Sequence, residues 1–346
     1  RLIHYLQKID NKNDYVILLK PKDFDGWQPS NPRFQKVICP YKEYTFAEQI
    51  GFKKQLESLH PDLVHFAMVQ QPVWYNSSPV VTTMQDLTTV RFKNPDKNPV
   101  AFWIKQQIYK WVNKKVAKKS SHIITISNFV KNDLIQFTGV NPEKITVTLE
   151  SADELPKGNE PVDELIGKKF IMYIGRPTPH KNLRRLIDAF ALLQKKYPDL
   201  TLALAGKKDS NYARHETYVN EHGIKNVVFT GFISDEQLRW MYENTAVYCF
   251  PSLSEGFGLP GLEAMLHGAP VASSTATCLP ETHGDAAHYF DPFSVEDIAK
   301  SIDDILSDDK LRNELVKKGK KHVKTFSWQR MAEQTLAVYE KYGRKS

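Results

Sequence analysis

The segment Ser254-Glu255-Gly256-Phe257-Gly258-Leu259-Pro260-Gly261-Leu262-Glu263-Ala264-Met265 decides the fold, because it joins a strand pattern to a helix pattern. Upstream of it, residues 247–250 form a β-branched and aromatic run. Downstream, residues 260–268 start with a proline suited to a first helical turn and end with a glycine suited to a stop. The order strand, turn, helix is typical of parallel α/β domains.

The turn in this segment is suited to binding a phosphate group. A helix start offers backbone N–H groups and the positive end of the helix dipole, and glycines let a phosphate approach the backbone closely. The pattern places Glu255 in the turn and Glu263 in the first helical turn. Two carboxylates would repel a phosphate unless they face hydroxyl groups, which a ribose and a hexose both supply. The segment therefore predicts a nucleotide-sugar site.

Two other interpretations of the segment remain open at this point. Gly256, Gly258 and Gly261 spell G-x-G-x-x-G with Glu281 about 20 residues beyond, which is the dinucleotide fingerprint of NAD-dependent oxidoreductases. Against it, the fingerprint normally opens the first βαβ unit, whereas this one lies late in the chain and follows Glu255 directly. The simpler alternative is a structural turn whose Glu263 only complements the helix dipole.

A second loop has the same order of elements and adds positive charge. The strand pattern at residues 170–174 is followed by Gly175, Arg176 and Lys181, and then by a helix pattern at residues 183–195. Arg176 and Lys181 are suited to hold the two phosphates of a nucleoside diphosphate and to neutralise its charge as it departs without a metal ion. Glu255 and Glu263 would then remain for hydroxyl groups. In the simpler alternative, Arg176 pairs with a surface acid and Lys181 is only exposed.

Short runs rich in β-branched and aromatic residues alternate with helical patterns along the chain. The predicted strands are residues 15–19, 63–66, 80–83, 122–126, 145–149, 170–174, 200–205, 227–229, 246–250 and 270–273. The predicted helices between them include residues 47–59, 102–116, 183–195 and 235–242. This alternation predicts the α/β class, with two doubly wound domains of parallel strands that meet within residues 151–168. Ligands of such sheets bind beyond the carboxyl ends of the strands.

The composition is that of a globular protein, with 41% hydrophobic and 25% charged residues among 346. No apolar run is long enough to predict a membrane span. Three widely spaced cysteines, Cys39, Cys249 and Cys278, are expected to be reduced packing residues of a cytoplasmic protein. The chain begins in a helical pattern with no strand before it, which predicts that the first strand of its α/β domain is missing.

The positive charge is concentrated in the first half of the chain. Residues 1–150 hold 21 Lys and Arg against 13 Asp and Glu, whereas the rest holds 26 against 27. This excess predicts either contact with an anionic surface such as a membrane, or solubility alone. The predicted helix at residues 102–119 carries many of these lysines together with Trp103, Tyr109 and Trp111, which suits a membrane surface. Packing is the preferred interpretation, because an apolar stripe is predicted to face the core at Ile104, Ile108, Trp111, Val112 and Val116.

No metal site is predicted. Asp23 and Asp25 match the Asp-x-Asp pattern of metal-dependent sugar transferases only in letters, because they lie in a polar turn. His180, His267 and His283 have no ligand-like spacing. The chain also lacks the P-loop and G-x-S-x-G patterns, which argues against the commonest NTPases and hydrolases.

Taken together, these residues resemble the retaining glycosyltransferases of family 4, which have the GT-B fold. The resemblance rests on the Glu-x7-Glu motif at Glu255 and Glu263 and on several matching segments. These are Gly175-Arg176 with Lys181-Asn182, Phe229-Thr230-Gly231-Phe232-Ile233, Pro280-Glu281 with Gly284-Asp285-Ala286-Ala287, and Phe326-Ser327-Trp328. They cover nearly all of residues 165–346, whereas residues 1–150 match only loosely, at Asp62-Leu63-Val64-His65, Gln85-Asp86-Leu87 and Thr125-Ile126-Ser127.

The resemblance implies a GT-B architecture of two Rossmann-like domains facing across a cleft. Residues 1–155 would form the acceptor-side domain, residues 165–326 the nucleotide-sugar domain, and residues 327–346 a helix that crosses back to the first domain. In the donor site, the residues implied as catalytic are Glu255, Arg176 and Lys181. Those implied to bind donor are Gly175, Arg176, Lys181, Gly231, Phe232, Glu255, Gly256, Phe257, Gly258, Leu259 and Glu263. On the acceptor or sugar side they are His65, Gln85 and Asp86.

The implied activity is transfer of a hexose, of mannose or glucose type, from a GDP- or UDP-linked sugar to a glycan or lipid-linked acceptor. We expect the anomeric configuration to be retained. We expect no metal, no cofactor and no nucleic-acid partner. The location expected is the cytoplasm, with peripheral contact at the inner face of the membrane. Many relatives have His-Asp where this chain has Gln85-Asp86, and the family's first glycine-rich loop would precede Arg1. These departures keep a noncatalytic subunit that binds sugar nucleotides or glycans as an alternative, besides the less favoured NAD-dependent oxidoreductase.

Overall fold

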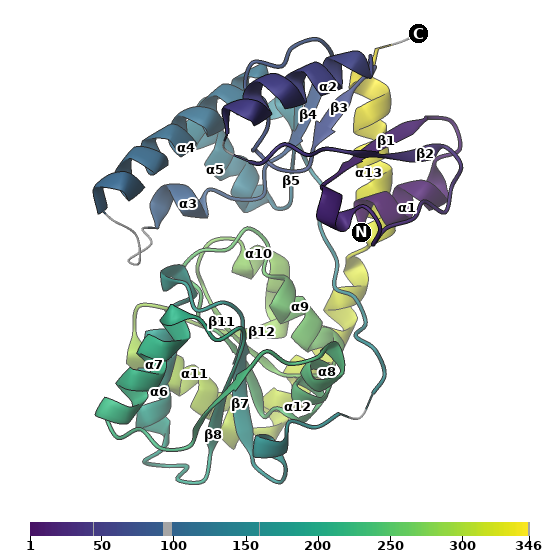
Figure 1. Cartoon of the computed structure of the whole chain (residues 1–346). Helices are drawn as coiled ribbons and strands as arrows, with labels where there is room; N and C mark the ends of the chain where they lie inside the picture. Colours follow the sequence, from purple (N-terminus) through teal and green to yellow (C-terminus); the bar gives the residue numbers. More distant parts are fainter. Residues whose placement is uncertain (44, 93–98, 159, 345–346) are drawn as a thin grey trace. The chain divides into compact units, whose positions relative to one another are not determined.

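The computed structural model describes residues 1–43, 45–92, 99–158 and 160–344. Within this part the chain divides into two compact units. Unit 1 comprises Arg1–Val90, Asn98–Glu150 and Ser327–Ser346, and unit 2 comprises Arg91–Lys97 and Ser151–Phe326. Each unit is an α/β domain whose described strands all pair in parallel, as predicted (Figure 1).

Unit 2 is built on a six-stranded sheet with the order β12-β11-β10-β7-β8-β9. Its strands are β7 (Phe170–Ile174), β8 (Thr201–Ala205), β9 (Val227–Gly231), β10 (Val247–Phe250), β11 (Val271–Ser274) and β12 (Ala287–Phe290). From β7 the chain adds β8 and β9 on one side and then returns to add β10, β11 and β12 on the other. The sheet thus grows in opposite directions from β7 and from β10, which makes the carboxyl ends of these two strands the topological switch point, where α/β sheets bind ligands.

The helices of unit 2 cover this sheet. They are α6 (Leu183–Leu193), α7 (Ser210–Glu221), α8 (Asp235–Asn244), α9 (Leu259–Leu266), α10 (Leu279–His283), α11 (Val295–Ser307) and α12 (Asp309–His322). The apolar stripe of α6, made of Leu183, Leu186, Ile187 and Phe190, is at most 2% exposed and packs in the main core cluster with β7, β8 and α11. Each such side chain contributes about 1.5 to 3 kcal/mol by its burial.

Unit 1 has two parallel sheets. The larger has the order β3-β4-β5-β6, with β3 (Val64–Phe66), β4 (Val80–Thr83), β5 (His122–Thr125) and β6 (Ile145–Val147). The smaller pairs β1 (Tyr15–Leu19) with β2 (Phe34–Ile38). The helices are α1 (Leu2–Ile9), α2 (Lys53–Ser58), α3 (Thr88–Arg91), α4 (Pro99–Lys119), α5 (Asn128–Thr138) and α13 (Trp328–Tyr342).

The last helix, α13, belongs to unit 1 although it follows unit 2 in the sequence. Its Val338 packs in a cluster with Val81 of β4 and Ile124 of β5, and the Tyr342 ring stacks on His122 with the ring centroids 4.4 Å apart. Figure 1 shows α13, in yellow, beside the purple helix α1, which it contacts. The two ends of the sequence are thus neighbours within one domain.

Helix α4 differs from the prediction that its apolar stripe faces the core. Ile104, Ile108 and Trp111 are 48%, 55% and 49% exposed, and of the predicted stripe only Val116 is fully buried. The buried face instead carries two amides, because Gln106 donates to the carbonyls of Thr89 and Val90 at 3.2 and 2.9 Å, and Asn113, 1% exposed, donates to that of Tyr109. The preference for packing was therefore wrong for this stripe.

Other elements differ less. The strands β2 and β12 were not predicted, and the predicted helix at residues 47–59 begins with a π-helical turn, Glu48–Phe52, before α2. The ten predicted strands are all present, and their ends differ from the prediction by at most two residues. Cys39, Cys249 and Cys278 are free and buried, as packing residues should be.

Candidate functional site

Two loops of unit 2 lie at the topological switch point, where the carboxyl ends of the neighbouring strands β7 and β10 meet. The first, residues 175–182, follows β7 and leads into α6. The second, residues 251–258, follows β10 and leads into α9. Both were singled out from the sequence, and the sheet order brings them together.

An ion pair joins the two loops. The ammonium nitrogen of Lys181 lies 2.6 Å from Oε1 of Glu255, and the two side chains are only 21% and 13% exposed. Lys181 is therefore not the exposed surface lysine of the simpler alternative. The sequence suggested that Glu255 would be left to bind hydroxyl groups alone. In the structure, one of its oxygens instead accepts a hydrogen bond from Lys181.

Arg176 leans toward the other side of β7. Its Nε lies 3.2 Å from Oδ2 of Asp209, which follows β8 and caps the start of α7. The Arg176 side chain is 73% exposed, so this pair alone contributes little stability. Burial acts to raise the pKa of Asp209, but the backbone amide of Tyr212 and the Arg176 guanidinium hold it below its ordinary value. The two predicted phosphate ligands, Arg176 and Lys181, thus have different carboxylate partners on opposite sides of β7.

Hydrogen bonds hold the first loop against the second. The Asn182 amide, 5% exposed, donates to the carbonyls of Pro251 at 3.0 Å and Pro292 at 2.7 Å. Leu253 N donates to the carbonyl of His180 at 2.7 Å. Asn182 is left-handed, at φ 59°, a conformation that asparagine tolerates better than most residues. The backbone on either side of Lys181 is therefore fixed.

Two glycines at the start of α9, the N-cap Gly258 and Gly261 within the helix, are needed for packing on α10. A Cβ at Gly261 would lie 2.3 Å from Nε2 of His283, and a Cβ at Gly258, where φ is 100°, would lie 2.7 Å from Leu279. The buried His283 ring bonds with Ser273 Oγ at 3.1 Å and with the Gly258 carbonyl at 3.2 Å. Burial lowers the pKa of His283 to about 4, so the ring is neutral at pH 7. His283 thus fixes the start of α9.

Glu263 lies in the second turn of α9, not in the first as predicted, because the helix begins at Leu259. Its side chain is half-buried. Burial raises the pKa of Glu263, the charge of Asp153 raises it further, and a hydrogen bond with Tyr242 opposes these effects. A half-buried carboxyl group of this kind is suited to bind hydroxyl groups.

The remaining predicted donor residues differ in exposure. Phe257 is 3% exposed and its ring meets that of Phe326 edge-on, so its side chain is a packing residue and only its backbone could meet a ligand. Gly231 ends β9 with φ 74°, and Phe232 beyond it is 87% exposed. An exposed aromatic ring at a strand's carboxyl end is suited to stack on a base.

Three buried hydroxyl groups around these loops have no hydrogen-bond partner in the structure, those of Tyr173, Tyr248 and Ser252. Tyr173 lies in β7, and its hydroxyl oxygen is close to Gly175. A Cβ added to Gly175 would lie 2.8 Å from that oxygen. Burial raises the pKa of Tyr173 well above its ordinary value, and the charge of Glu255 acts in the same direction. The hydroxyl therefore stays protonated next to the site.

The predicted residues of unit 1 have mostly local roles. Both ring nitrogens of His65 are bonded within the unit, Nδ1 to the hydroxyl of Tyr339 in α13 and Nε2 to Thr83 Oγ1 at 2.8 Å, and burial lowers its pKa to about 4. These contacts give His65 a structural role, because they attach α13 to the sheet. Its predicted contact with sugar stays a prediction. Asp86 accepts from the Thr88 amide at 2.7 Å at the start of α3, and Gln85 is exposed.

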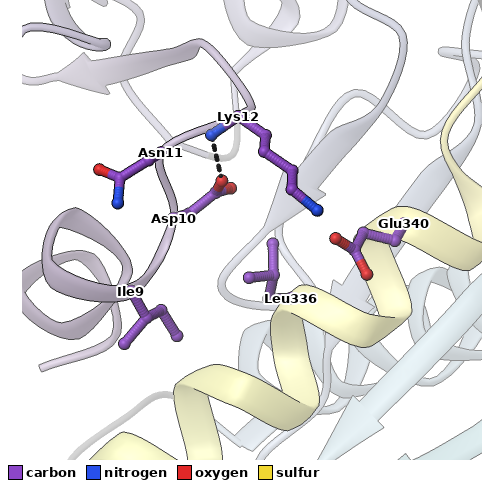
Figure 2. Close-up of a pocket in the computed structure, with 6 residues that line it drawn as sticks. All are labelled: Ile9, Asp10, Asn11, Lys12, Leu336 and Glu340. Atoms are coloured by element: carbon purple, nitrogen blue, oxygen red, sulfur yellow. Dashed lines mark hydrogen bonds between the residues drawn. The ribbon is translucent and has the colours of Figure 1, made fainter.

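A shallow hollow of about 200 Å³ in unit 1 carries no comparable chemistry. Figure 2 shows its lining residues, Ile9, Asp10, Asn11, Lys12, Leu336 and Glu340. The carboxylate of Asp10 accepts from the Lys12 amide at 2.8 Å and from the Asn13 side chain at 2.7 Å. The Asp10 carboxylate therefore stabilises the turn between α1 and β1.

Two absences hold for the described residues. No group of three or more His, Cys, Asp or Glu is placed there to hold a metal ion. Among those same residues, no helix is both long and apolar enough to cross a membrane.

Two family models match the two units. Residues 16–149 match the model described as Glycosyltransferase Family 4, and residues 158–322 match that described as Glycosyl transferases group 1. The chain belongs to glycosyltransferase family 4. This membership sets aside the dinucleotide interpretation of Gly256, Gly258 and Gly261.

Curated relatives of this family 4 glycosyltransferase include several mannosyltransferases. O-antigen chain mannosyltransferase B of Escherichia coli is 32% identical over 233 residues, which are 63% of this chain and 60% of that protein. MMP α-(1→4)-mannosyltransferase of Mycolicibacterium hassiacum is 30% identical over 273 residues, which are 76% of this chain and 65% of that protein. The matched segment thus spans less than two thirds of each of these relatives.

Solved structures show the GT-B fold. Sucrose-phosphate synthase of Thermosynechococcus elongatus superposes with a TM-score of 0.76 at 20% identity, over 98% of this chain and 91% of that one. Anabaena HepE, solved in complex with UDP and glucose, superposes with a TM-score of 0.72 at 17% identity, over 98% of this chain and 94% of that one. At these identities the likeness concerns the fold alone.

Sequence reasoning missed several residues that shape the site: Asp209, Thr277 and Tyr173. It considered His283 only as a metal ligand and missed its packing against α9. Asp209 carried a signal, because it follows a strand and a glycine and precedes a helical pattern, as an N-cap does. Thr277, left-handed at φ 56°, accepts from the Glu255 amide at 3.1 Å and had no such signal. Its role depends on how the loop after β11 folds.

Proposed function

We propose that this chain transfers a hexose from a nucleoside diphosphate sugar to an acceptor hydroxyl, with retention of anomeric configuration and without a metal ion. The single observation that carries the proposal is the Lys181–Glu255 ion pair across the switch point between β7 and β10. It places a cation and a carboxylate, both largely buried, where a sheet of this order binds nucleotides.

In this proposal Lys181 binds both Glu255 and a phosphate oxygen. An ammonium group donates three hydrogen bonds, so Glu255 does not exhaust it. Arg176 is mostly exposed and can turn from Asp209 to a second phosphate oxygen. The start of α9 and the backbone of residues 256–259 supply N–H groups and the positive end of a helix dipole to the diphosphate.

The two carboxylates would hold hydroxyl groups. Glu263 binds the ribose diol, and the half-buried state that raises its pKa suits a group that faces neutral donors. The remaining acceptor positions of Glu255 bind the sugar, since a carboxylate offers about four such positions. Gly231 and Phe232 contact the base. Gly175 allows the diphosphate to approach the carboxyl end of β7.

The reaction follows from this placement. The acceptor oxygen attacks the anomeric carbon from the face that the diphosphate leaves, so the bond to the phosphate oxygen breaks as the new glycosidic bond forms. The acceptor proton passes to the departing phosphate oxygen. Lys181 and Arg176 neutralise the charge that develops there, and the protein contributes position and electrostatics in place of a nucleophile.

Mannose is the donor sugar that the relatives favour. Both relatives described above are named mannosyltransferases, and one of them is named for an O-antigen chain. A GDP-linked mannose is therefore the first donor to test, with UDP-glucose as the second, since a structural neighbour was solved with UDP and glucose. A glycan or lipid-linked glycan is the proposed acceptor, and the cytoplasm the proposed location.

Donor binding tests the proposal first. A nucleotide sugar at about 100 times its dissociation constant should raise the free energy of unfolding by roughly 2.7 kcal/mol, which a thermal-shift panel detects. We expect one GDP- or UDP-linked hexose to raise the melting temperature more than its free nucleoside. A panel without any stabilising sugar nucleotide would contradict the proposal.

Transfer itself separates the enzyme from a noncatalytic subunit. With the stabilising donor and a mannose-terminated oligosaccharide as acceptor, a glycoside should form, and its one-bond C1–H1 coupling should show the anomeric configuration of the donor. Donor binding without transfer to any glycan acceptor would support the noncatalytic alternative, to which Gln85 points.

A further inference from the structure

Helix α4 presents an apolar, aromatic surface to solvent. Trp103, Ile104, Ile108 and Trp111 are 59%, 48%, 55% and 49% exposed. Trp74, 60% exposed on a neighbouring loop, extends this surface, because its ring lies 6.2 Å from that of Trp111. We call these five residues the α4 face. Such a cluster of large exposed apolar side chains on one helix marks a contact surface.

The residues of the α4 face are not core residues that a rotation of the helix would bury. The opposite side of the helix is already packed against unit 1 by Gln106, Asn113, Val116 and Ala117, each at most 8% exposed. The Gln106 amide donates to two carbonyls near the end of α3, which fixes the rotation of α4 about its axis. The apolar side chains therefore face outward because polar ones are buried in their place.

Positive charge continues the same face. Helix α4 has six lysines and no acidic residue. With 3.6 residues per turn, Lys115 and Lys118 fall on the same side of the helix as Ile104, Ile108 and Trp111. They lie about one and two turns beyond Trp111. Lys114, Lys115 and Lys118 are all exposed. The surface is thus apolar and aromatic in its first half and cationic in its second.

We propose that the α4 face binds an anionic lipid bilayer from one side, with α4 lying along the headgroup region. Tryptophan is favoured at the boundary between acyl chains and headgroups, and lysines are attracted to lipid phosphates. A second copy of this chain is a poorer occupant, because a symmetric contact would bury the lysines of α4 against a helix that has no acidic residue to pair with them. The inference goes beyond the proposed transfer activity and does not depend on it.

Vesicle flotation of the whole chain tests the proposal, with no nucleotide sugar present. We expect binding to vesicles of phosphatidylcholine with about 30 mol % phosphatidylglycerol, weak binding to phosphatidylcholine alone, and release in about 0.5 M NaCl. The triple variant Lys114→Gln, Lys115→Gln, Lys118→Gln should bind roughly 100-fold more weakly, since each lysine contributes severalfold. The triple variant Trp103→Gln, Ile104→Gln, Ile108→Gln should bind the anionic vesicles at least about tenfold more weakly.

The matched control removes the same charge elsewhere. Lys317, Lys321 and Lys324 are exposed in and after α12, and their replacement by Gln should leave vesicle binding within about twofold, because no apolar face accompanies them. The proposal is overturned by three results: absence of binding to the anionic vesicles, equal loss in the control and the α4 variants, or dimers in sedimentation velocity that only the α4 variants abolish. Each is measurable on folded protein, because every replaced side chain is exposed or half-exposed.

Discussion

Helices α6 of unit 2 and α4 of unit 1 have similar apolar patterns in sequence but opposite surroundings in the structure. In α6 the stripe that includes Leu186 and Phe190 is fully buried against the sheet. In α4 the corresponding stripe, which includes Ile104 and Ile108, is half-exposed, and amides occupy the buried side. Periodicity thus predicts that an apolar face exists, but only the tertiary structure shows what covers it. The predictions below test this difference and the site that α6 supports.

The largest effect is expected from truncating the buried stripe. Phe190→Ala should lower the free energy of unfolding by about 3 to 5 kcal/mol, because it leaves a cavity in the core of unit 2. Ile108→Ala in α4 should change it by no more than about 0.5 kcal/mol, because the side chain is 55% exposed. Denaturant unfolding measures both. A similar cost for the two variants would show that α4 is packed as α6 is.

The second prediction concerns the ion pair at the start of α6. Lys181→Ala should reduce kcat/KM for sugar transfer by about 100-fold or more, because the leaving diphosphate loses a charge partner and Glu255 is left half-buried without one. Lys317→Ala in α12, an exposed lysine far from the switch point in sequence, is the matched control and should retain full activity. Full activity of Lys181→Ala would remove this residue from the site.

A smaller effect is expected at the glycine that lets α9 approach α10. Alanine normally favours a helix by about 1 kcal/mol over glycine. In Gly261→Ala, however, the new Cβ would lie 2.3 Å from the His283 ring, so we expect a net loss of about 2 kcal/mol and weaker donor binding. Gly26→Ala, whose Cβ would meet only a carbonyl at 3.8 Å, should be neutral within about 0.5 kcal/mol. Stabilisation by Gly261→Ala would contradict the packing of α9 on His283.

The smallest effect is a pH dependence from two buried histidines. Burial lowers the pKa of His283 in unit 2 and of His65 in unit 1 to about 4, whereas an unfolded histidine titrates near 6.5. Between these values the unfolded chain binds protons that the folded chain does not, so stability should fall as the pH drops from about 6.5 to about 4 and stay level above. Over the range from pH 7 to about 5.5, each histidine should contribute about 1 kcal/mol to this fall.

Unfolding curves at several pH values measure this slope, and His283→Gln should flatten it. The amide of glutamine can replace one of the two ring bonds without titrating. An unchanged slope in this variant would show that the buried ring of His283 is not responsible.

Much of the site in unit 2 could be predicted from the sequence, because local signals mark it. Strand, glycine and helix start follow one another at Gly175 and again at Gly258, and the sheet order then brings the two loops together. The predicted functions of Lys181, Glu255 and Glu263 remain predictions, but the structure places Lys181 and Glu255 in contact. Their ion pair joins residues 74 positions apart, which no local pattern specifies.

Other features depended on tertiary contacts and could not be predicted. The simpler alternative paired Arg176 with a surface acid, but that this acid is Asp209 depends on β7 and β8 being neighbours. The hydrogen bond between His65 and Tyr339 joins β3 to α13, which follows much later in the chain, so no local pattern indicated it. The orientation of α4 was predicted wrongly because Gln106 and Asn113 are buried, which the binary pattern of the helix argues against.

A crystal structure of the whole chain with the nucleotide sugar that stabilises it most tests the central claim most directly. We predict that the diphosphate lies at the carboxyl ends of β7 and β10, with a phosphate oxygen within hydrogen-bond distance of Lys181 Nζ and the start of α9. Glu263 should then contact the ribose hydroxyls. A diphosphate bound elsewhere, with neither Lys181 nor the N-terminal amides of α9 in contact with it, would contradict the account.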